Sequence, residues 1–209
     1  MLAEVRRERF GRGVPPRPRG AYAAWKRGLD AALAGLGLVV ASPLLAAIAL
    51  AIRLDSPGPV LFRQRRSGRG SAEFVLLKFR SMAVGTPDLA THLVAPGSLR
   101  VTRVGALLRR TSLDELPQLW NVLRGDMALV GPRPALHNQD DLIALRQRAD
   151  VDALRPGLTG WAQINGRDEI PMDLKLRYDA EYLARMSPAF DAAILARTAL
   201  TLFTMRGVR

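Results

Sequence analysis

Two adjacent carboxylates, Asp114 and Glu115, are the residues of this 209-residue chain best suited to covalent and metal-dependent chemistry. Pro117 fits the first turn of a helix, which Ser112 or Asp114 would cap. The helix dipole would then favour ionised carboxylates. An ionised aspartate can attack phosphorus as a nucleophile, and a neighbouring glutamate can hold the magnesium that neutralises phosphates. Two carboxylates in a first helical turn are also common without any catalytic role.

Several basic side chains suited to phosphate binding occur on both sides of this pair in the sequence. Arginine presents a fixed fork of N–H donors that matches phosphate oxygens, and flanking prolines would hold the backbone of Arg133 rigid. Each of these residues alone could be an ordinary solvated charge. Together they predict a site that handles phosphates, with the candidate binding residues Lys78, Arg80, Arg109 and Arg133.

Composition limits the possible chemistry and partners. With no cysteine there is no disulfide, thiol nucleophile or thiolate metal site, and two histidines are too few for a histidine-built metal centre. Any metal must therefore be bound by carboxylates and substrate oxygens, which suits magnesium. The net charge of +12 calls for negatively charged partners, namely nucleic acid, anionic lipid or phosphorylated substrates.

An almost uninterrupted apolar stretch at residues 31–52 is long enough to cross a hydrocarbon core of about 30 Å. It is too long, and too far from the N-terminus, for a cleavable signal peptide. Ser42 and Pro43 lie in its middle, where the missing proline N–H predicts a bend. The stretch is therefore a membrane segment, but its apolar length alone does not decide between a spanning and a re-entrant helix.

Charges at both ends of this segment favour the re-entrant alternative. Lys26 and Arg27 precede it, and Arg53 follows it. Basic flanks prefer the cytoplasm, so their presence at both ends suggests that the chain enters and leaves through one leaflet. A spanning helix remains the alternative.

The rest of the chain divides simply. Residues 1–20 are expected to be a flexible basic tail, 21–53 the membrane helix, and 54–209 one catalytic domain. We expect an α+β fold that is mostly helical with little strand. A strand is predicted at 74–78, and an amphipathic helix at 189–205 that lies on the membrane or against the core. Further helices are predicted near 103–110, 117–123, 140–149 and 173–186.

Many short motifs in one order give the chain a family resemblance. From about Lys26 to about Phe203 it resembles the monotopic bacterial phosphoglycosyl transferases, the initiating sugar transferases of glycan and exopolysaccharide assembly. Its length resembles that of the small single-domain members. The matching segments are Lys26-Arg27 with Asp30, Ser42-Pro43, 58–64, 78–82, 112–119, 125–134 and 156–167.

The resemblance implies a location and an architecture. The enzyme would lie in the bacterial inner membrane with its catalytic domain on the cytoplasmic face. A re-entrant helix would be broken at Ser42-Pro43, and amphipathic helices would lie in the interface. Membrane lipid would be a partner and nucleic acid would not, while the sequence leaves open whether the chain forms a homodimer.

The resemblance also implies a reaction and its residues. A sugar phosphate would pass from a UDP-sugar to polyprenyl (undecaprenyl) phosphate, releasing UMP, in a magnesium-dependent ping-pong reaction. By matched position, Asp114 would be the nucleophile and Glu115 the magnesium ligand. The implied phosphate and substrate contacts are Lys78, Arg80, Arg109, Arg133 and Arg167.

The identity of the sugar is less clear from the motifs. Members of this family often carry an aromatic residue where Met172 stands, in a region thought to touch the sugar. The sequence at residues 161–163, Trp-Ala-Gln, is more similar to members that use N-acetylated sugars than to hexose-1-phosphate transferases.

Two other functions fit parts of the sequence. A magnesium-dependent membrane phosphatase or nucleotide-sugar hydrolase would use water as the acceptor, but would gain little from a membrane segment. A basic nucleic-acid-binding protein is the second alternative. An aromatic content of 6% and a long apolar stretch argue against it.

Overall fold

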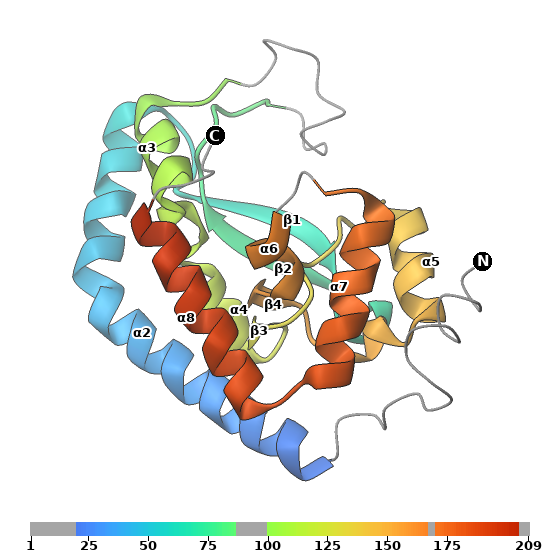
Figure 1. Cartoon of the computed structure of the whole chain (residues 1–209). Coiled ribbons are helices and arrows are strands. Elements are labelled where there is room, and N and C mark those ends of the chain that lie inside the picture. The colour runs from blue at the N-terminus through green and yellow to red at the C-terminus, as the bar shows by residue number, and fades with distance from the viewer. Residues whose placement is uncertain (1–19, 87–99, 167–169, 205–209) are drawn as a thin grey trace.

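The computed structural model describes residues 20–86, 100–166 and 170–204. One long helix, α2 (Gly20–Asp55), runs along one side of a body built from short helices and two small sheets (Figure 1). The predicted class, mostly helical with little strand, is confirmed for these residues. The predicted tail, apart from Gly20, lies outside the described residues, as does Arg167.

The chain after α2 turns back on itself as an antiparallel hairpin of β1 (Leu61–Ser67) and β2 (Glu73–Phe79). A 3-10 turn, η1 (Arg69–Ser71), joins the strands. Gly70 within it has a φ of 64°, a left-handed conformation that glycine adopts at little steric cost. The structure thus confirms the strand predicted at 74–78.

The remaining elements alternate between short helices and very short strands. Each predicted helix has a counterpart whose ends differ by a few residues. In chain order the elements are α3 (Arg103–Thr111), η3 (Leu113–Glu115), α4 (Gln118–Arg124), β3 (Ala128–Val130), α5 (Asp140–Arg148), η4 (Val151–Ala153), β4 (Gly157–Thr159), α6 (Trp161–Gly166), α7 (Met172–Arg185) and α8 (Pro188–Thr204).

Strands β3 and β4 are parallel, and glycines allow the segments at their ends to approach closely. The N–H of Gly131 donates to Thr159 at 2.9 Å. A Cβ added at Gly157 would lie 2.1 Å from the nitrogen of Gly131, so a side chain there would force the segments apart. The loop that carries Arg133 is therefore held against the segment that leads into α6.

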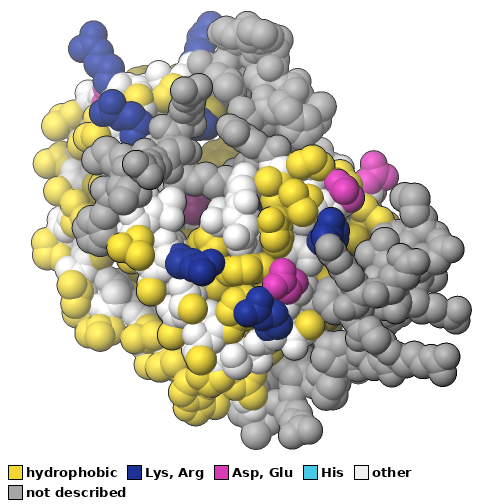
Figure 2. Space-filling model, in the orientation of Figure 1, with side chains coloured by type: hydrophobic (Ala, Val, Ile, Leu, Met, Phe, Trp, Pro, Cys, Tyr) yellow, Lys and Arg dark blue, Asp and Glu magenta, His cyan; other side chains and the backbone are white. Residues whose placement is uncertain are grey.

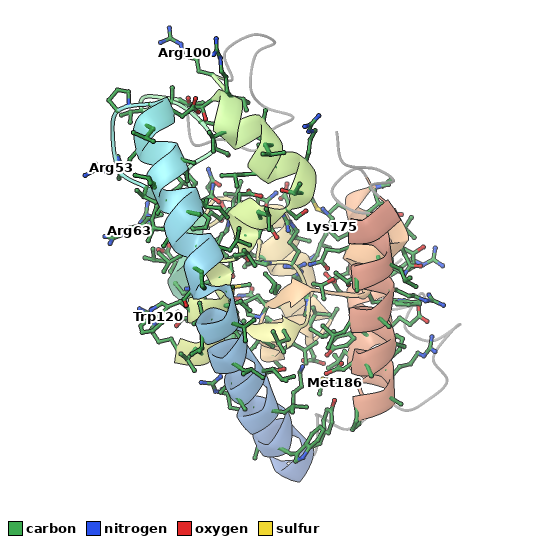
Figure 3. All side chains as sticks on the ribbon, turned by 90° about the vertical axis from the view of Figure 1, so that its left-hand side faces the viewer. Arg53, Arg63, Arg100, Trp120, Lys175 and Met186 are labelled. Carbon is green, nitrogen blue, oxygen red and sulfur yellow. The ribbon has the colours of Figure 1, made fainter. Side chains whose placement is uncertain are left out.

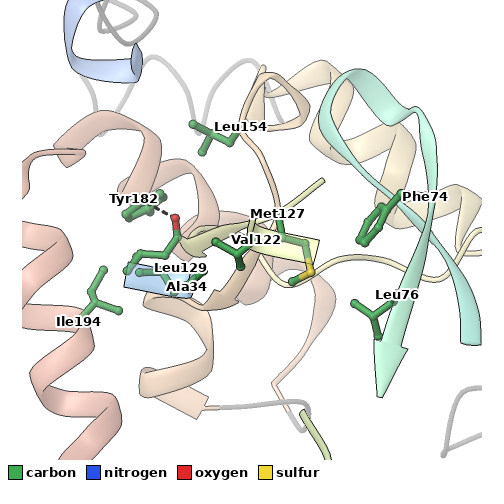
Figure 4. Packing of buried hydrophobic residues seen from close by; sticks show 10 residues of the cluster. Ala34, Phe74, Leu76, Val122, Met127, Leu129, Leu154, Tyr182 and Ile194 are labelled. Carbon is green, nitrogen blue, oxygen red and sulfur yellow. Dashed lines mark hydrogen bonds between the residues drawn. The ribbon is translucent and has the colours of Figure 1, made fainter. Parts of the chain in front are cut away.

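The main core lies where α2, α4, β3 and α7 meet (Figure 4). Val122, Met127 and Val130 are almost completely buried in it. Tyr182 of α7 is also buried, and its hydroxyl donates to the carbonyl of Val130 at 3.1 Å. This packing fixes β3, and with it the loop that follows, relative to α7.

Helix α2 is part of this fold along most of its length. Ala34 is fully buried in the main core, and Ile48 and Ile52 pack in a second cluster with Phe79 and Leu108. Residues near both ends of the helix therefore contact the same body.

The outer side of α2 is apolar and exposed. Only 11% of its most apolar stretch is buried, which a helix in the core of a soluble protein would not show. Figure 2 shows hydrophobic side chains along the left-hand edge, where α2 lies, and Figure 3 shows Trp120 beside the same helix. Its large exposed apolar side chains are Trp25, Leu29, Leu33, Leu36, Val39, Val40, Leu44, Leu50 and Leu54. By length and composition, α2 is the one helix in the described part of the chain that could cross a membrane.

Ser42 and Pro43 lie inside α2 rather than between two helices. The helix is continuous from Gly20 to Asp55, and its axis changes direction partway along (Figure 1). The Ser42 hydroxyl donates to the carbonyl of Val39 at 2.7 Å, and such bonds from serine to the preceding turn tend to bend helices. The described conformation is thus a bend within one helix.

Candidate active site

Asp114 and Glu115 lie on the tight 3-10 turn η3, between the end of α3 and the start of α4. Ser112 has a φ of 57° and ends α3, so the chain reverses direction just before the carboxylates. Pro117 is the N-cap of α4, and no side chain caps that helix. The prediction that Ser112 or Asp114 caps α4 is therefore wrong. The pair is presented by a turn, where burial and the neighbouring charges shift the pKa values of the two carboxyls.

The Asp114 carboxyl is mostly buried, with 9% of the residue exposed. Burial raises the pKa of this carboxyl above the ordinary aspartate value, and Glu115 adds to the rise, while Lys78 and Arg109 oppose it. It makes no hydrogen bond or ion pair with another described side chain. A carboxyl of this kind, poorly solvated and not engaged by a partner, is suited to act as a nucleophile once ionised.

Glu115 is in the opposite situation, because two cations hold one of its oxygens. Lys78 Nζ lies 2.7 Å from Oε1, and Arg133 Nη2 lies 3.4 Å from the same atom. Burial disfavours the charged form, but Lys78 and Arg133 outweigh it and lower the pKa of Glu115 to about 2. Two adjacent carboxyls thus have pKa values that are shifted in opposite directions, an arrangement typical of sites that divide chemical roles between neighbours.

The three cations of the site come from separate elements. Lys78 is near the end of β2, Arg109 is in the last turn of α3, and Arg133 is in the loop after β3. Arg109 is close enough to influence the ionisation of Asp114, yet its side chain forms no hydrogen bond or ion pair with a described residue. The structure therefore brings three predicted cations to Asp114 or Glu115, and the guanidinium of Arg109 is available to a ligand.

Arg80 is the predicted phosphate ligand that the structure places elsewhere. It is buried, and its guanidinium binds carbonyls at the C-terminal end of α2, donating to Ser56 at 2.7 Å and also to Pro57. Its Nη2 further donates to the Ser56 hydroxyl at 3.0 Å. Arg80 closes the junction between α2 and the hairpin and is not brought together with Glu115.

Lys26 and Arg27, predicted as membrane flanks, are engaged inside the fold. Lys26 Nζ lies 2.7 Å from Asp191 and 3.2 Å from Asp30. Arg27 donates to two carbonyls at the end of α4, each at 2.6 Å. Both residues thus attach the first part of α2 to the body.

Sequence reasoning missed the residues that position the site. Asn121 of α4 accepts from the Leu77 N–H at 3.0 Å and donates to the Val75 carbonyl at 2.7 Å. These bonds dock the edge of β2 on α4, one residue before Lys78. No predicted motif assigned a role to Asn121, which lies two residues beyond the 112–119 segment.

Arg146 and Asp179 position Arg133 in a similar way. Arg146 of α5 forms a buried ion pair with Asp179 of α7 at 2.7 Å, and its third nitrogen donates to the backbone carbonyl of Arg133 at 2.8 Å. A buried ion pair that also orders a loop holds the Arg133 backbone beside the carboxylates. No sequence pattern links these three residues.

The fold thus combines an exposed apolar helix, long enough to cross a membrane, with a pair of adjacent carboxyls near three cations. Residues 21–205 match the bacterial sugar transferase family, and the chain belongs to that family. Its named relatives are transferases.

Three relatives illustrate the similarity. A UDP-glucose:undecaprenyl-phosphate glucose-1-phosphate transferase of Caulobacter vibrioides is 46% identical over 198 residues, which cover 90% of this chain and 73% of the relative. An enzyme of the same name from Xanthomonas campestris is 44% identical over 82% of this chain and 37% of its own length. A UDP-N-acetylgalactosamine-undecaprenyl-phosphate N-acetylgalactosaminephosphotransferase of Aeromonas hydrophila is 38% identical over 92% of this chain and 47% of its own length. The chain thus spans less than half of the latter two.

Proposed function

We propose that the chain transfers a sugar phosphate from a UDP-sugar to undecaprenyl phosphate, through a covalent intermediate on Asp114, in the first membrane step of glycan or exopolysaccharide assembly. The named reactions of the relatives support the substrates. The observation that carries the mechanism is the contrast between the adjacent carboxyls. Asp114 is buried without a described partner, whereas Lys78 and Arg133 hold Glu115.

The reaction would proceed in two displacements at one phosphorus atom. An Asp114 oxygen attacks the sugar-bearing phosphorus of the UDP-sugar, and the bond to the bridging oxygen breaks, so that UMP leaves with the electron pair. A phosphate oxygen of undecaprenyl phosphate then attacks the same phosphorus, and the bond to Asp114 breaks. This second step yields undecaprenyl-diphosphate sugar and restores the carboxylate.

The cations act where negative charge develops during these steps. Arg109 makes no ion pair with a described residue and lies close enough to influence Asp114, so it can bind a phosphate oxygen there. Lys78 and Arg133 neutralise Glu115 and place positive charge beside it, where the phosphates would bind. Exclusion of water around Asp114 favours transfer to lipid over hydrolysis.

The adjacent carboxylates fit a magnesium ion of the kind that uses one or two protein carboxylates, several waters and substrate phosphates. Within the described residues no group of three histidine, aspartate or glutamate side chains offers a fully protein-built site. The Oε2 atom of Glu115 has no described partner and would be the metal ligand, since cations occupy Oε1. Magnesium bound there would supply positive charge to the phosphates of the donor.

The sugar is proposed to be N-acetylated. The support for this is the resemblance of residues 161–163 to members of the family that use N-acetylated sugars. Gln163 of α6 lies beside Gly160, which contacts the Gly131 loop. Trp161 is held by Glu181 and by cation–π contacts with two arginines, so it orders α6.

We also propose that α2 is re-entrant and that the catalytic domain faces the cytoplasm. Arg27 near one end of α2 binds the end of α4, while Ile52 near the other end packs against Phe79 and Leu108. A helix whose two ends both contact one polar domain has both ends on the domain's side of the membrane. The bend near Ser42 and Pro43 and the basic residues at both ends support this arrangement.

A lipid-free reaction tests the covalent step. Wild-type protein incubated with magnesium and a UDP-sugar should release about one UMP per active site and gain the mass of one sugar phosphate, as expected of covalent catalysis. Asp114→Asn should do neither. Glu115→Gln should slow both half-reactions and weaken the magnesium dependence while still forming the adduct on Asp114.

UMP that appears only when undecaprenyl phosphate is present, without an adduct, would establish direct transfer instead. Continuous release of free sugar phosphate into water would establish a hydrolase.

A further inference from the structure

A second depression, remote from the carboxylates, gathers several positive charges. It is an open depression whose space of about 470 Å³ is continuous with the solvent. Its charged lining residues are Lys26, Arg27, Asp30, Arg69 and Arg155, and Ala128, Val130, Ala153, Leu154, Tyr182 and Met186 complete its walls. We call this depression the arginine pocket.

The arginine pocket is distinct from the active site. Asp114 and Glu115 lie on the turn just before α4, whereas Arg27 and Arg155 bind carbonyls at the far end of that helix. Helix α4 has 7 residues and so spans about 10 Å. None of the side chains around the carboxylates lines the arginine pocket.

The backbone anchors the arginines of this pocket through only part of each guanidinium. Arg69 donates from Nε to the Ala153 carbonyl, and Arg155 donates from Nε to the Gly125 carbonyl, both at 3.0 Å. The two terminal nitrogens of each guanidinium have no described hydrogen-bond partner. These terminal nitrogens form the fork that matches phosphate oxygens, and the Nε bonds hold the forks in place.

The charges in the pocket are not balanced within the described part of the chain. Arg27, Arg69 and Arg155 form no ion pair with a described carboxylate. The one carboxylate in the lining, Asp30, is 3.2 Å from Lys26. Burial, followed by the nearby positive charges of Arg69 and Arg27, lowers the pKa of Arg155. Asp30 opposes this shift only in part, so the guanidiniums still repel one another, and a bound anion would relieve that repulsion.

We propose that the arginine pocket is a second binding site for a phosphate group, held by the forks of Arg69 and Arg155 against a wall fixed by Arg27. Arg27 belongs to the membrane helix, close to the end of α2 that enters the body. The phosphate could therefore come from a lipid headgroup or from a soluble phosphate, since the forks recognise the same oxygens in both. This site does not depend on the reaction proposed at Asp114.

Titration of the full chain in detergent with inorganic phosphate tests the site. Arg69→Gln and Arg155→Gln should each weaken binding by about tenfold or more, as expected when a charge-assisted fork contact is lost. Arg148→Gln is the matched control, because Arg148 is exposed on α5 and lines neither site. An Arg133→Gln titration identifies the contribution of the active site, and unchanged melting temperatures show that the variants are folded.

A second titration distinguishes the two sources of phosphate. Short-chain phosphatidylglycerol is added in micelles, with short-chain phosphatidylcholine as the reference lipid. Loss of phosphatidylglycerol binding in Arg69→Gln and Arg155→Gln, with inorganic phosphate unaffected, assigns the pocket to a lipid headgroup. Loss of inorganic phosphate binding alone assigns it to a soluble phosphate, and loss of both leaves the site open to either. If both variants bind both ligands within about twofold of Arg148→Gln, the proposed site does not exist.

Discussion

At the scale of single residues, the site depends on how each cation is used. Arg133 lies 3.4 Å from Glu115, and Arg146 donates to its backbone carbonyl. A lysine in its place could still neutralise Glu115, but it would present a point charge in place of a planar fork. The shape of the guanidinium, more than its charge, is therefore what Arg133 contributes.

We expect Arg133→Lys to lower the rate of lipid-linked product formation by about tenfold to a thousandfold, the range found when one transition-state donor is removed. The measurement is turnover with a UDP-sugar and undecaprenyl phosphate. Arg148→Lys, at an exposed position of α5, is the control and should keep near wild-type turnover. Near-normal turnover of Arg133→Lys would mean that the guanidinium of Arg133 acts only as a positive charge and makes no specific contact with phosphate.

The raised pKa of Asp114 predicts a pH dependence. Since only the ionised carboxylate attacks, the first half-reaction should fail on the acid side at a pH above the ordinary aspartate range. Arg109 favours the ionised form, so its removal must raise that pKa further and move the acid limb to higher pH.

Single-turnover UMP release by Arg109→Gln, measured across pH, checks this shift. Arg110→Gln provides the neighbouring control, since Arg110 is exposed. Identical acid limbs in the two variants would mean that Arg109 does not affect the ionisation of Asp114.

At the scale of elements, the helices and the active-site segment were accessible to sequence reasoning, but their long-range contacts were not. Helical spacing and the proline and glycine positions predicted α3 to α5, α7 and α8, and a short apolar run predicted β2. Strand β1 was missed because its polar residues, three arginines among them, lack apolar alternation. The role of Arg80 was also missed, since only the fold shows that α2 ends beside it.

The buried pair of Arg146 and Asp179 couples two helices to the active-site loop. If Arg146 acts through Arg133, then Arg146→Met should lower turnover in the wild-type background and add little to Arg133→Lys, because coupled residues are non-additive. Arg124→Met, which removes an exposed ion pair with Asp126, is the control. Its effect on turnover should be additive with that of Arg133→Lys.

A stability control separates positioning from folding. Arg146→Met leaves Asp179 buried without its partner, which should cost about 3–5 kcal/mol of unfolding free energy. The double variant Arg146→Met with Asp179→Leu should recover stability, because no charge is left unpaired, but should not recover turnover. Recovery of both would show that the pair serves only the fold.

At the scale of the whole molecule, α2 is both a membrane element and a structural part of the catalytic body. Its outer side is apolar and exposed along most of its length, whereas its inner side contributes Ala34 to the main core and Ile52 to the second cluster. The helix and the relatives indicate membrane association. Such a helix cannot leave the body without exposing core residues, so α2 and the body must move as one unit.

The topology of α2 gives the last prediction. The chain has no cysteine, so single cysteines can report which side of the membrane a residue faces. Ala24 and Leu54 are exposed near the two ends of α2, and Leu54 is 79% exposed. If the helix is re-entrant, cysteines at both positions resist a membrane-impermeant maleimide in intact cells and react in inverted membrane vesicles, because both ends share the domain's side. Pro43→Leu restores an N–H and removes the ring that bends the helix, so it should shift the protein toward a spanning form in which the two ends respond oppositely. Labelling of one end of the wild-type protein from outside intact cells would mean that α2 spans the membrane and that its contacts with the body must break at that end.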